Sequence, residues 1–140
     1  MEPATTTNPS ATKVLCIEDE HFISELYTRA LIKAGYLVDV QFDGEAGLKA
    51  AQTDQYDIIL LDLMVPSMTG IEILQVLRDP VKTPKLHAKV IVTTNLEQRE
   101  AARTELEKQA DGYLVKAEMT PRELVEFLNR LNPAPSSTPS

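Results

Sequence analysis

The stretch of the chain that decides the fold is Ile58-Ile59-Leu60-Leu61-Asp62-Leu63-Met64-Val65-Pro66-Ser67-Met68-Thr69-Gly70, in which an apolar run ends at a carboxylate. An apolar run of this length is typical of a strand that is buried on both faces of a sheet. Ionised carboxylates ordinarily stay in water, because burying one without a partner costs free energy. Asp62 at the tip of such a strand therefore indicates a group with a chemical role.

Three other short apolar runs end in polar side chains in the same way. They are residues 14–17 before Glu18-Asp19-Glu20, residues 90–93 before Thr94, and residues 112–115 before Lys116. The carboxyl ends of the strands in an open parallel sheet form the edge at which ligands bind. We therefore expect these side chains to converge with Asp62 on one edge.

Helical patterns separate the apolar runs, which gives five strand–helix units in series. The predicted order is strand 14–17, helix 22–34, strand 37–40, helix 44–52, strand 58–61, helix 71–78, strand 90–93, helix 96–109, strand 112–115 and helix 121–131. Gly35 predicts the end of the first helix, and Thr120 with Glu123 predicts a capping box at the start of the last. Such an alternation predicts an α/β fold, a doubly wound parallel sheet with strand 58–61 near its centre.

Composition sets the class of protein and the kinds of partner. The chain has 140 residues, and we expect one domain over residues 13–131 between flexible tails at 1–12 and 132–140, which are rich in Pro, Ser, Thr and Ala. A net charge of −7 argues against direct binding to nucleic acid or to an anionic membrane. The single cysteine, Cys16, lies within an apolar run, and no signal peptide or membrane span is evident, so a cytoplasmic location is predicted.

The carboxylates of Glu18, Asp19 and Asp62 would repel one another at such an edge. At ~4 Å each pair costs about 4 kcal/mol at an effective dielectric of 20, so either a pKa rises or a cation binds. Magnesium prefers oxygen ligands and is usually held by one or two carboxylates together with a phosphate. The arrangement suits a Mg²⁺-assisted phosphoryl acceptor, in which Lys116 and Thr94 would bind oxygens of the transferred group.

On these residues the chain resembles the receiver domain of two-component response regulators, a flavodoxin-like fold of five strands and five helices. The resemblance covers residues 13–131. It rests on Val14-Leu15-Cys16-Ile17-Glu18-Asp19-Glu20, Leu61-Asp62-Leu63-Met64-Val65-Pro66 through Gly70, Val90-Ile91-Val92-Thr93-Thr94, and Ala110-Asp111-Gly112-Tyr113-Leu114-Val115-Lys116.

The resemblance implies a role for each residue at the edge. Those roles are Asp62 as phosphoacceptor, Asp19 as direct Mg²⁺ ligand, Glu18 as outer carboxylate, the Met64 carbonyl as a further ligand, Thr94 as switch hydroxyl, Tyr113 as switch aromatic and Lys116 as phosphate-binding lysine. The implied partners are a sensor histidine kinase or phosphotransfer protein, an unidentified downstream protein, and a second copy across the fourth helix, fifth strand and fifth helix. The only catalysis implied is self-catalysed phosphotransfer to Asp62 and hydrolysis of the resulting aspartyl phosphate.

Three residues depart from the family pattern. Glu18 stands where aspartate is usual, Asn95 follows the switch threonine where a small residue is typical, and Ala117 replaces the usual proline after Lys116. A non-proline cis peptide costs about 3–4 kcal/mol, so we expect a trans peptide before Ala117 and a changed loop. Thr94, rather than Thr93, has the family's spacing from Lys116.

Several functions remain open from the sequence. The leading interpretation is a stand-alone, phosphorylation-dependent switch, since residues 132–140 are too few for an output domain. The first alternative is a receiver-like module that binds its partner without phosphorylation. A small Mg²⁺-dependent phosphohydrolase is less favoured, because Met64 stands where a second aspartate is expected. A flavodoxin-type cofactor protein is disfavoured, because no Gly-rich phosphate loop follows residues 14–17.

Overall fold

The computed structural model describes residues 11–84, 86–95, 104 and 108–131. The elements in chain order are β2 (Lys13–Ile17), α1 (His21–Lys33), β3 (Leu37–Gln41), α2 (Gly44–Gln52), β4 (Ile58–Asp62), α3 (Gly70–Arg78), β5 (Lys89–Thr94), β6 (Gly112–Val115), the 3₁₀ turn η1 (Lys116–Glu118) and α5 (Pro121–Leu131).

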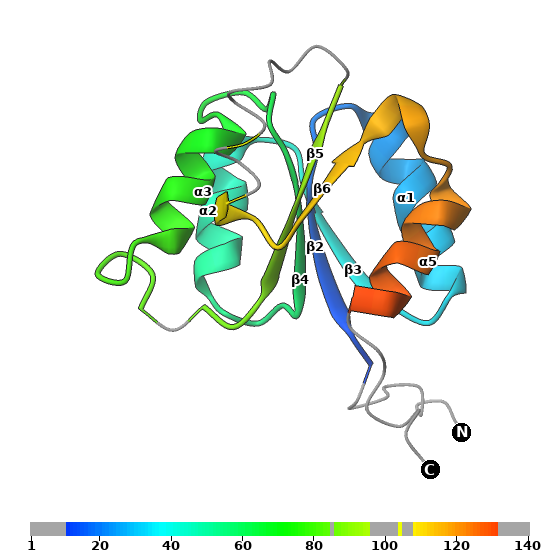
Figure 1. The fold of residues 1–140 in the computed structure, drawn as a ribbon, viewed down its shortest axis with the longest axis horizontal. Helices are drawn as coiled ribbons and strands as arrows, with labels where there is room; N and C mark the ends of the chain where they lie inside the picture. Colours follow the sequence, from blue (N-terminus) through cyan, green and yellow to red (C-terminus); the bar gives the residue numbers. More distant parts are fainter. Residues whose placement is uncertain (1–10, 85, 96–103, 105–107, 132–140) are drawn as a thin grey trace.

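The five strands form one parallel sheet in the order β3-β2-β4-β5-β6. Helices α2 and α3 cover one face of the sheet, and α1 and α5 cover the other (Figure 1). The predicted doubly wound α/β architecture is confirmed, and β4 lies at the centre of the sheet as expected. The predicted fourth helix, over residues 96–109, falls almost wholly outside the described residues.

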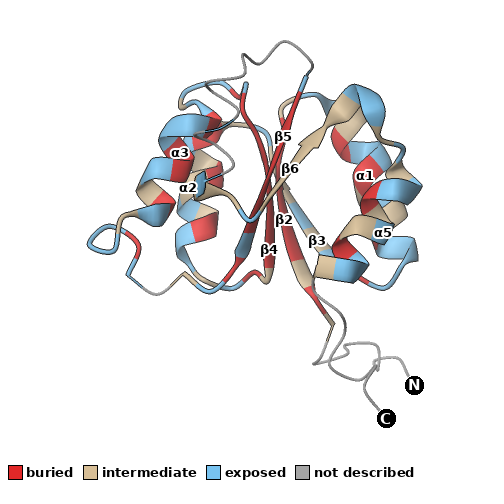
Figure 2. Ribbon diagram, viewed as in Figure 1, coloured by how far each residue is buried: buried red, intermediate tan, exposed pale blue. Residues whose placement is uncertain are grey.

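Alternating side chains of the strands divide the core into two clusters. In β4, Ile59 and Leu61 face α2 and α3, whereas Ile58 and Leu60 face α1 and α5. Every residue of β4 is buried, and buried residues run along the centre of the sheet in Figure 2. Burial on both faces explains why this strand is apolar up to Asp62.

Local sequence signals end and begin the helices. Gly35, which follows the end of α1, has φ +102°, a conformation that glycine adopts without steric cost. Thr120 and Glu123 form the predicted capping box, since the Glu123 N–H donates to the Thr120 hydroxyl and the Thr120 N–H donates to the Glu123 carboxylate. Thr69 and Glu72 make a second capping box, which starts α3 one residue earlier than the sequence predicts.

Because all strands run in the same direction, the described fold begins and ends at the edge of the sheet opposite the carboxyl ends of the strands. β2 begins, and α5 ends, at the edge opposite the one where the strands terminate (Figure 1). Every peptide bond in the described residues is trans, including the expected bond before Ala117. Among the described helices, none is both long and apolar enough to cross a membrane.

Candidate functional site

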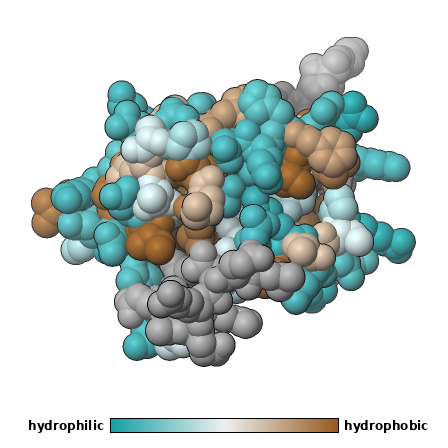
Figure 3. Space-filling model, turned by 90° about the horizontal axis from the view of Figure 1, so that it is seen from above, coloured by the Kyte–Doolittle hydropathy of each residue, from teal (hydrophilic) through white to brown (hydrophobic). Residues whose placement is uncertain are grey.

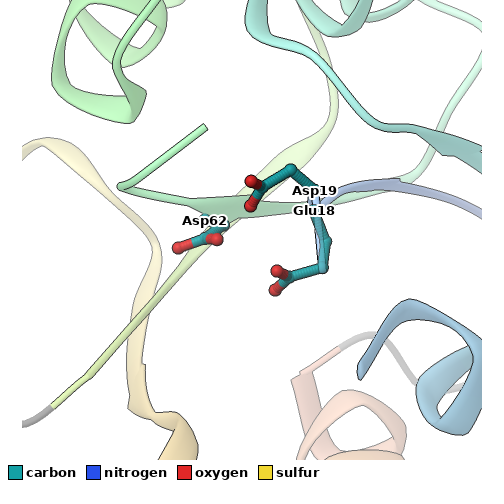
Figure 4. A group of neighbouring side chains, drawn as sticks. All are labelled: Glu18, Asp19 and Asp62. Carbon is teal, nitrogen blue, oxygen red and sulfur yellow. The ribbon is translucent and has the colours of Figure 1, made fainter. Parts of the chain in front are cut away.

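Three carboxylates converge where β2 and β4 end. Glu18 and Asp19 follow β2 directly, and Asp62 is the last residue of β4. One carboxylate oxygen from each lies within 4.8 Å of the other two, and Figure 4 shows the three side chains around a common space. The register of the parallel strands causes this convergence, because Ile17 pairs with Leu61 and the following residues leave the sheet side by side.

Lys116, which directly follows β6, reaches the same group of carboxylates. Its Nζ lies 2.9 Å from Glu18 Oε1 and 3.2 Å from Asp62 Oδ2. The side chains of these three residues are 7%, 2% and 4% exposed, so the ion pairs are almost fully removed from water. Two buried carboxylates therefore share one buried ammonium group, with Asp19 beside them.

The backbone around Asp62 holds its carboxylate in place. The Met64 N–H donates to Asp62 Oδ1 at 3.2 Å. Gly70, the first residue of α3, lies so close to Asp62 that an added Cβ would be 2.6 Å from the Asp62 carbonyl oxygen. Absence of a side chain at Gly70 thus lets α3 begin directly against the end of β4.

Burial and neighbouring charges shift the pKa values of Glu18 and Lys116. Burial, together with the neighbouring Asp62 carboxylate, raises the pKa of Glu18 to about 7, although Lys116 opposes the shift. Burial alone would lower the pKa of Lys116, but the hydrogen bond to Glu18 and the charge of Asp62 raise it above its usual range. The ammonium group of Lys116 therefore remains charged beside the carboxylates of Glu18 and Asp62.

Thr94 and Tyr113, the two residues that the family resemblance implies as a switch, lie on the face of the sheet opposite to that of Asp62. Thr94 ends β5 two residues after Val92, and Tyr113 pairs with Val92, so the side chains of Thr94 and Tyr113 share the face covered by α2 and α3. Thr93 is the cross-strand partner of Asp62, so the side chains of Thr93 and Asp62 share the opposite face of the sheet. The buried Thr94 hydroxyl donates to the Asn95 carbonyl oxygen at 3.1 Å.

The structure adds Glu20 to the residues that sequence reasoning selected. Its Oε1 lies 3.5 Å from Lys116 Nζ, although its side chain is 58% exposed. The acidic triplet was visible in the sequence, but only the fold reveals that its third member faces the lysine. Met64 is 69% exposed at the same edge. Figure 3, which looks down on this edge, shows hydrophilic residues across its middle and hydrophobic ones on either side.

The fold and the site place the chain in the class of parallel α/β domains that carry an acidic cluster and a lysine at the carboxyl edge of the sheet, and comparison with known proteins identifies the family. The profile of the response regulator receiver domain matches residues 14–129. Over 120 residues the chain is 34% identical to the response regulator ArlR of Staphylococcus haemolyticus, and this alignment covers 86% of the chain and 51% of ArlR. The chain is 40% identical over 104 residues to the transcriptional regulatory protein HprR of Escherichia coli, and this alignment covers 74% of the chain and 44% of HprR.

Solved structures agree with this assignment. The receiver domain of the Francisella response regulator 1452 superposes with a TM-score of 0.74 at 30% identity, over 86% of this chain and 95% of that domain. The chemotaxis response regulator CheY4 of Vibrio cholerae gives a TM-score of 0.73 at 29% identity, over 86% of this chain and 98% of CheY4.

The chain therefore belongs to the response regulator receiver domain family of two-component systems. Members of this family are phosphorylation-dependent regulators rather than classical enzymes, and they bind Mg²⁺ at an acidic pocket. The chain spans about half the length of the curated relatives that it matches.

Proposed function

We propose that this chain is a signalling switch that accepts a phosphoryl group on Asp62 from a histidine kinase or a phosphotransfer protein. The observation that carries the proposal is the position of Asp62, which is buried at the end of the central strand, close to two further carboxylates and 3.2 Å from Lys116 Nζ. A group that costs so much to bury is expected to have a chemical role.

The side chains divide the reaction between them. An Asp62 carboxylate oxygen forms the new P–O bond, while the P–N bond of a phosphohistidine breaks and its electron pair returns to the imidazole, which takes up a proton. Lys116 would release Asp62 and bind an oxygen of the transferred group, where its charge offsets that of the phosphoryl oxygens. The Met64 N–H donates to Asp62 Oδ1 and so restricts the orientation of the carboxylate.

The residues present fit a Mg²⁺ ion. The cluster offers only oxygen ligands, and burial together with the nearby Asp62 carboxylate raises the pKa of Glu18, so a divalent cation bound there would favour its ionised form. Asp19, Asp62 and the Met64 carbonyl would bind the ion, with Glu18 acting as an outer carboxylate. Mg²⁺ bound there would neutralise charge on the phosphoryl oxygens during transfer.

Intact mass spectrometry tests the proposal. The chain is incubated with acetyl phosphate and Mg²⁺, and the result expected is the mass gain of one phosphoryl group, which is lost when EDTA is present. Acetyl phosphate supplies the phosphorus through cleavage of its P–O bond to acetate, so no kinase is needed. A chain that gains no mass would favour the alternative of a phosphorylation-independent interaction module.

Asp19→Asn is expected to weaken Mg²⁺ binding at least about tenfold, since losing even an outer partner of a metal site costs that much. The same substitution removes one of three mutually repelling charges, so the metal-free protein should melt at a higher temperature. Titration calorimetry measures the first effect and thermal melts in EDTA the second. Glu25→Gln, on the exposed face of α1, is the control; it should leave Mg²⁺ affinity unchanged and alter the melting temperature only slightly, because the ion pair that it removes with Arg29 is exposed. Wild-type affinity in Asp19→Asn would remove Asp19 from the ligand set.

Phosphorylation is expected to act through Thr94 and Tyr113. A phosphoryl group on Asp62 brings new acceptor oxygens to the end of β4, and a hydroxyl that leaves the Asn95 carbonyl could bond to one of them. Movement of Thr94 changes the space next to Tyr113, because the two side chains share one face of the sheet. The surface around β6 and α5 would then differ between the two states, and a downstream protein would distinguish them.

Thr94→Ala should therefore still accept phosphate on Asp62 but lose most of the conformational response. Backbone amide shifts of β6 and α5 are compared with and without beryllofluoride, which mimics the phosphoryl group. Thr93→Ala is the matched control, because Thr93 is equally buried and one residue away but faces the opposite side. A full response in Thr94→Ala together with a lost response in Thr93→Ala would assign the switch to Thr93.

A further inference from the structure

Ser67, five residues after the proposed acceptor Asp62, has a backbone conformation that serine rarely adopts. Its φ is +70°, and in the described part of the chain only Asp54 is another non-glycine residue with positive φ. Such a conformation is unfavourable for a residue with a side chain and persists only where surrounding contacts enforce it. The contact here is a hydrogen bond from the Ser67 hydroxyl to Asp43 Oδ1, 2.5 Å long.

Asp43 belongs to the connection between β3 and α2, which lies against the loop over residues 63–69. Its carboxylate caps α2 by accepting from the Glu45 N–H at 2.9 Å, and the same N–H lies 3.1 Å from Ser67 Oγ. The Gly44 N–H donates to the Pro66 carbonyl at 2.8 Å. A side chain at Gly44 would collide with the Met68 carbonyl oxygen, so the two loops are in direct contact.

The start of the same connection also lies next to the loop that carries Glu18 and Asp19, because Gln41 and Phe42 contact the residues at the two ends of that loop. The Phe42 ring stacks on the ring of His21, with centroids 4.0 Å apart and an interplanar angle of 16°. The Glu18 N–H donates to the Gln41 carbonyl at 3.0 Å. The connection between β3 and α2 is thus held beside the loop of Glu18 and Asp19 through Gln41 and Phe42, and beside the loop over residues 63–69 through Asp43.

We propose that Phe42 and Asp43 form a brace that sets the position of the loop over residues 63–69 relative to the loop that carries Glu18 and Asp19, with Asp43 and Ser67 as positioning residues for Mg²⁺ binding. The inference rests on the proposed function, since it concerns the same site. The loop held by Ser67 contains Met64, whose N–H orients Asp62 and whose carbonyl is the proposed metal ligand. If that loop were released, every metal ligand would still be present, but the distances between the ligands would be less fixed.

Two substitutions at Asp43 separate geometry from charge. Asp43→Asn removes the charge but keeps an oxygen that can accept from both Ser67 and the α2 backbone, so Mg²⁺ affinity should stay close to that of the wild type. Asp43→Ser also removes the charge and still caps α2, because serine is as good an N-cap, but it is too short to reach Ser67. Ser67→Ala removes the donor. Asp43→Ser and Ser67→Ala should each weaken Mg²⁺ binding roughly tenfold, the lower end for loss of an outer partner.

The test is calorimetric titration of the full chain with magnesium chloride, accompanied by thermal melts in EDTA. The double variant of Asp43→Ser and Ser67→Ala should bind Mg²⁺ about as weakly as either single variant, because both remove one interaction. Asp79→Ser is the control, since Asp79 also holds an exposed turn by accepting from backbone N–H groups, at the far end of α3. It should lower the melting temperature without changing Mg²⁺ affinity.

The outcomes distinguish this inference from the proposed function. Unchanged Mg²⁺ affinity in Asp43→Ser and Ser67→Ala, alongside a wild type that binds Mg²⁺ and is phosphorylated, would overturn the brace alone, and a lowered melting temperature would then mark a purely structural contact. Equal weakening in Asp43→Asn and Asp43→Ser would also overturn it, because charge would explain both. A wild type that neither binds Mg²⁺ nor gains a phosphoryl group would overturn the proposed function, and the brace with it.

Discussion

Asp62→Asn is expected to abolish phosphorylation of this chain completely. The amide has nearly the same shape as the carboxylate, but its single oxygen is neutral and too weak a nucleophile to form the bond to phosphorus. An amide oxygen can still accept from the Met64 N–H, so the fold around the site should persist. Intact mass after treatment with acetyl phosphate and Mg²⁺ measures the effect, with circular dichroism to verify folding.

Asp57→Asn is the matched control for this prediction. Asp57 directly precedes the same strand, at the edge opposite the acidic cluster, where its carboxylate accepts from the Lys13 N–H. That variant should gain one phosphoryl group like the wild type. Undiminished labelling of Asp62→Asn would assign the acceptor role to Glu18 or Asp19, which peptide mapping of the labelled chain would identify.

Lys116→Met is expected to destabilise the metal-free protein by about 3–5 kcal/mol near neutral pH, the usual consequence of removing one partner from a buried ion pair. Methionine is a flexible, unbranched residue that can fill much of the same space, so loss of packing is a minor part of the effect. Glu18 and Asp62 would then be buried without a cation, next to Asp19.

The loss in Lys116→Met should depend on pH. The folded-state pKa of Glu18 is already raised to about 7, and removal of the ammonium group would raise it further. A carboxylate with a raised folded-state pKa favours folding most below its unfolded pKa, and that contribution disappears as the pH rises through the folded value. The variant should therefore be closest to the wild type in acid and furthest from it above neutrality.

Urea unfolding in EDTA at about pH 5 and about pH 8 measures this dependence. Lys89→Met, at an exposed position that begins β5, is the control and should change the free energy of unfolding by less than about 0.5 kcal/mol at either pH. Addition of Mg²⁺ at the higher pH should restore part of the stability of Lys116→Met. Equal losses at both pH values would show that Lys116 stabilises the fold through packing rather than charge.

The sequence predicted the sheet because its apolar runs are short and end in polar groups. Burial of β4 on both faces required an apolar run, and that requirement also made Asp62 conspicuous. The start of α3 was predicted one residue late, although Thr69 and Glu72 carry the same capping signature that located α5. The gathering of Asp62, Glu18, Asp19 and Lys116 at one edge followed from strand direction alone.

Contacts between loops could not be predicted in this way. Asp43 and Ser67 lie 24 residues apart and belong to loops whose approach depends on how α2 and α3 pack on the sheet. Neither residue has a sequence pattern that distinguishes it from an ordinary turn or cap. Glu20 was part of a visible acidic triplet, but its direction toward Lys116 depends on where the chain turns into α1.

The positions of Lys13 and Leu131 have a practical consequence for experiments on this protein. These residues begin β2 and end α5 at the edge of the sheet furthest from the carboxylates (Figure 1). A fluorophore, an affinity handle or a surface linker joined to either end would therefore leave the fold on the side away from Asp62. Immobilised chains should present their acidic edge to the solution, so phosphodonor proteins can be screened on a sensor surface without the attachment obstructing their approach.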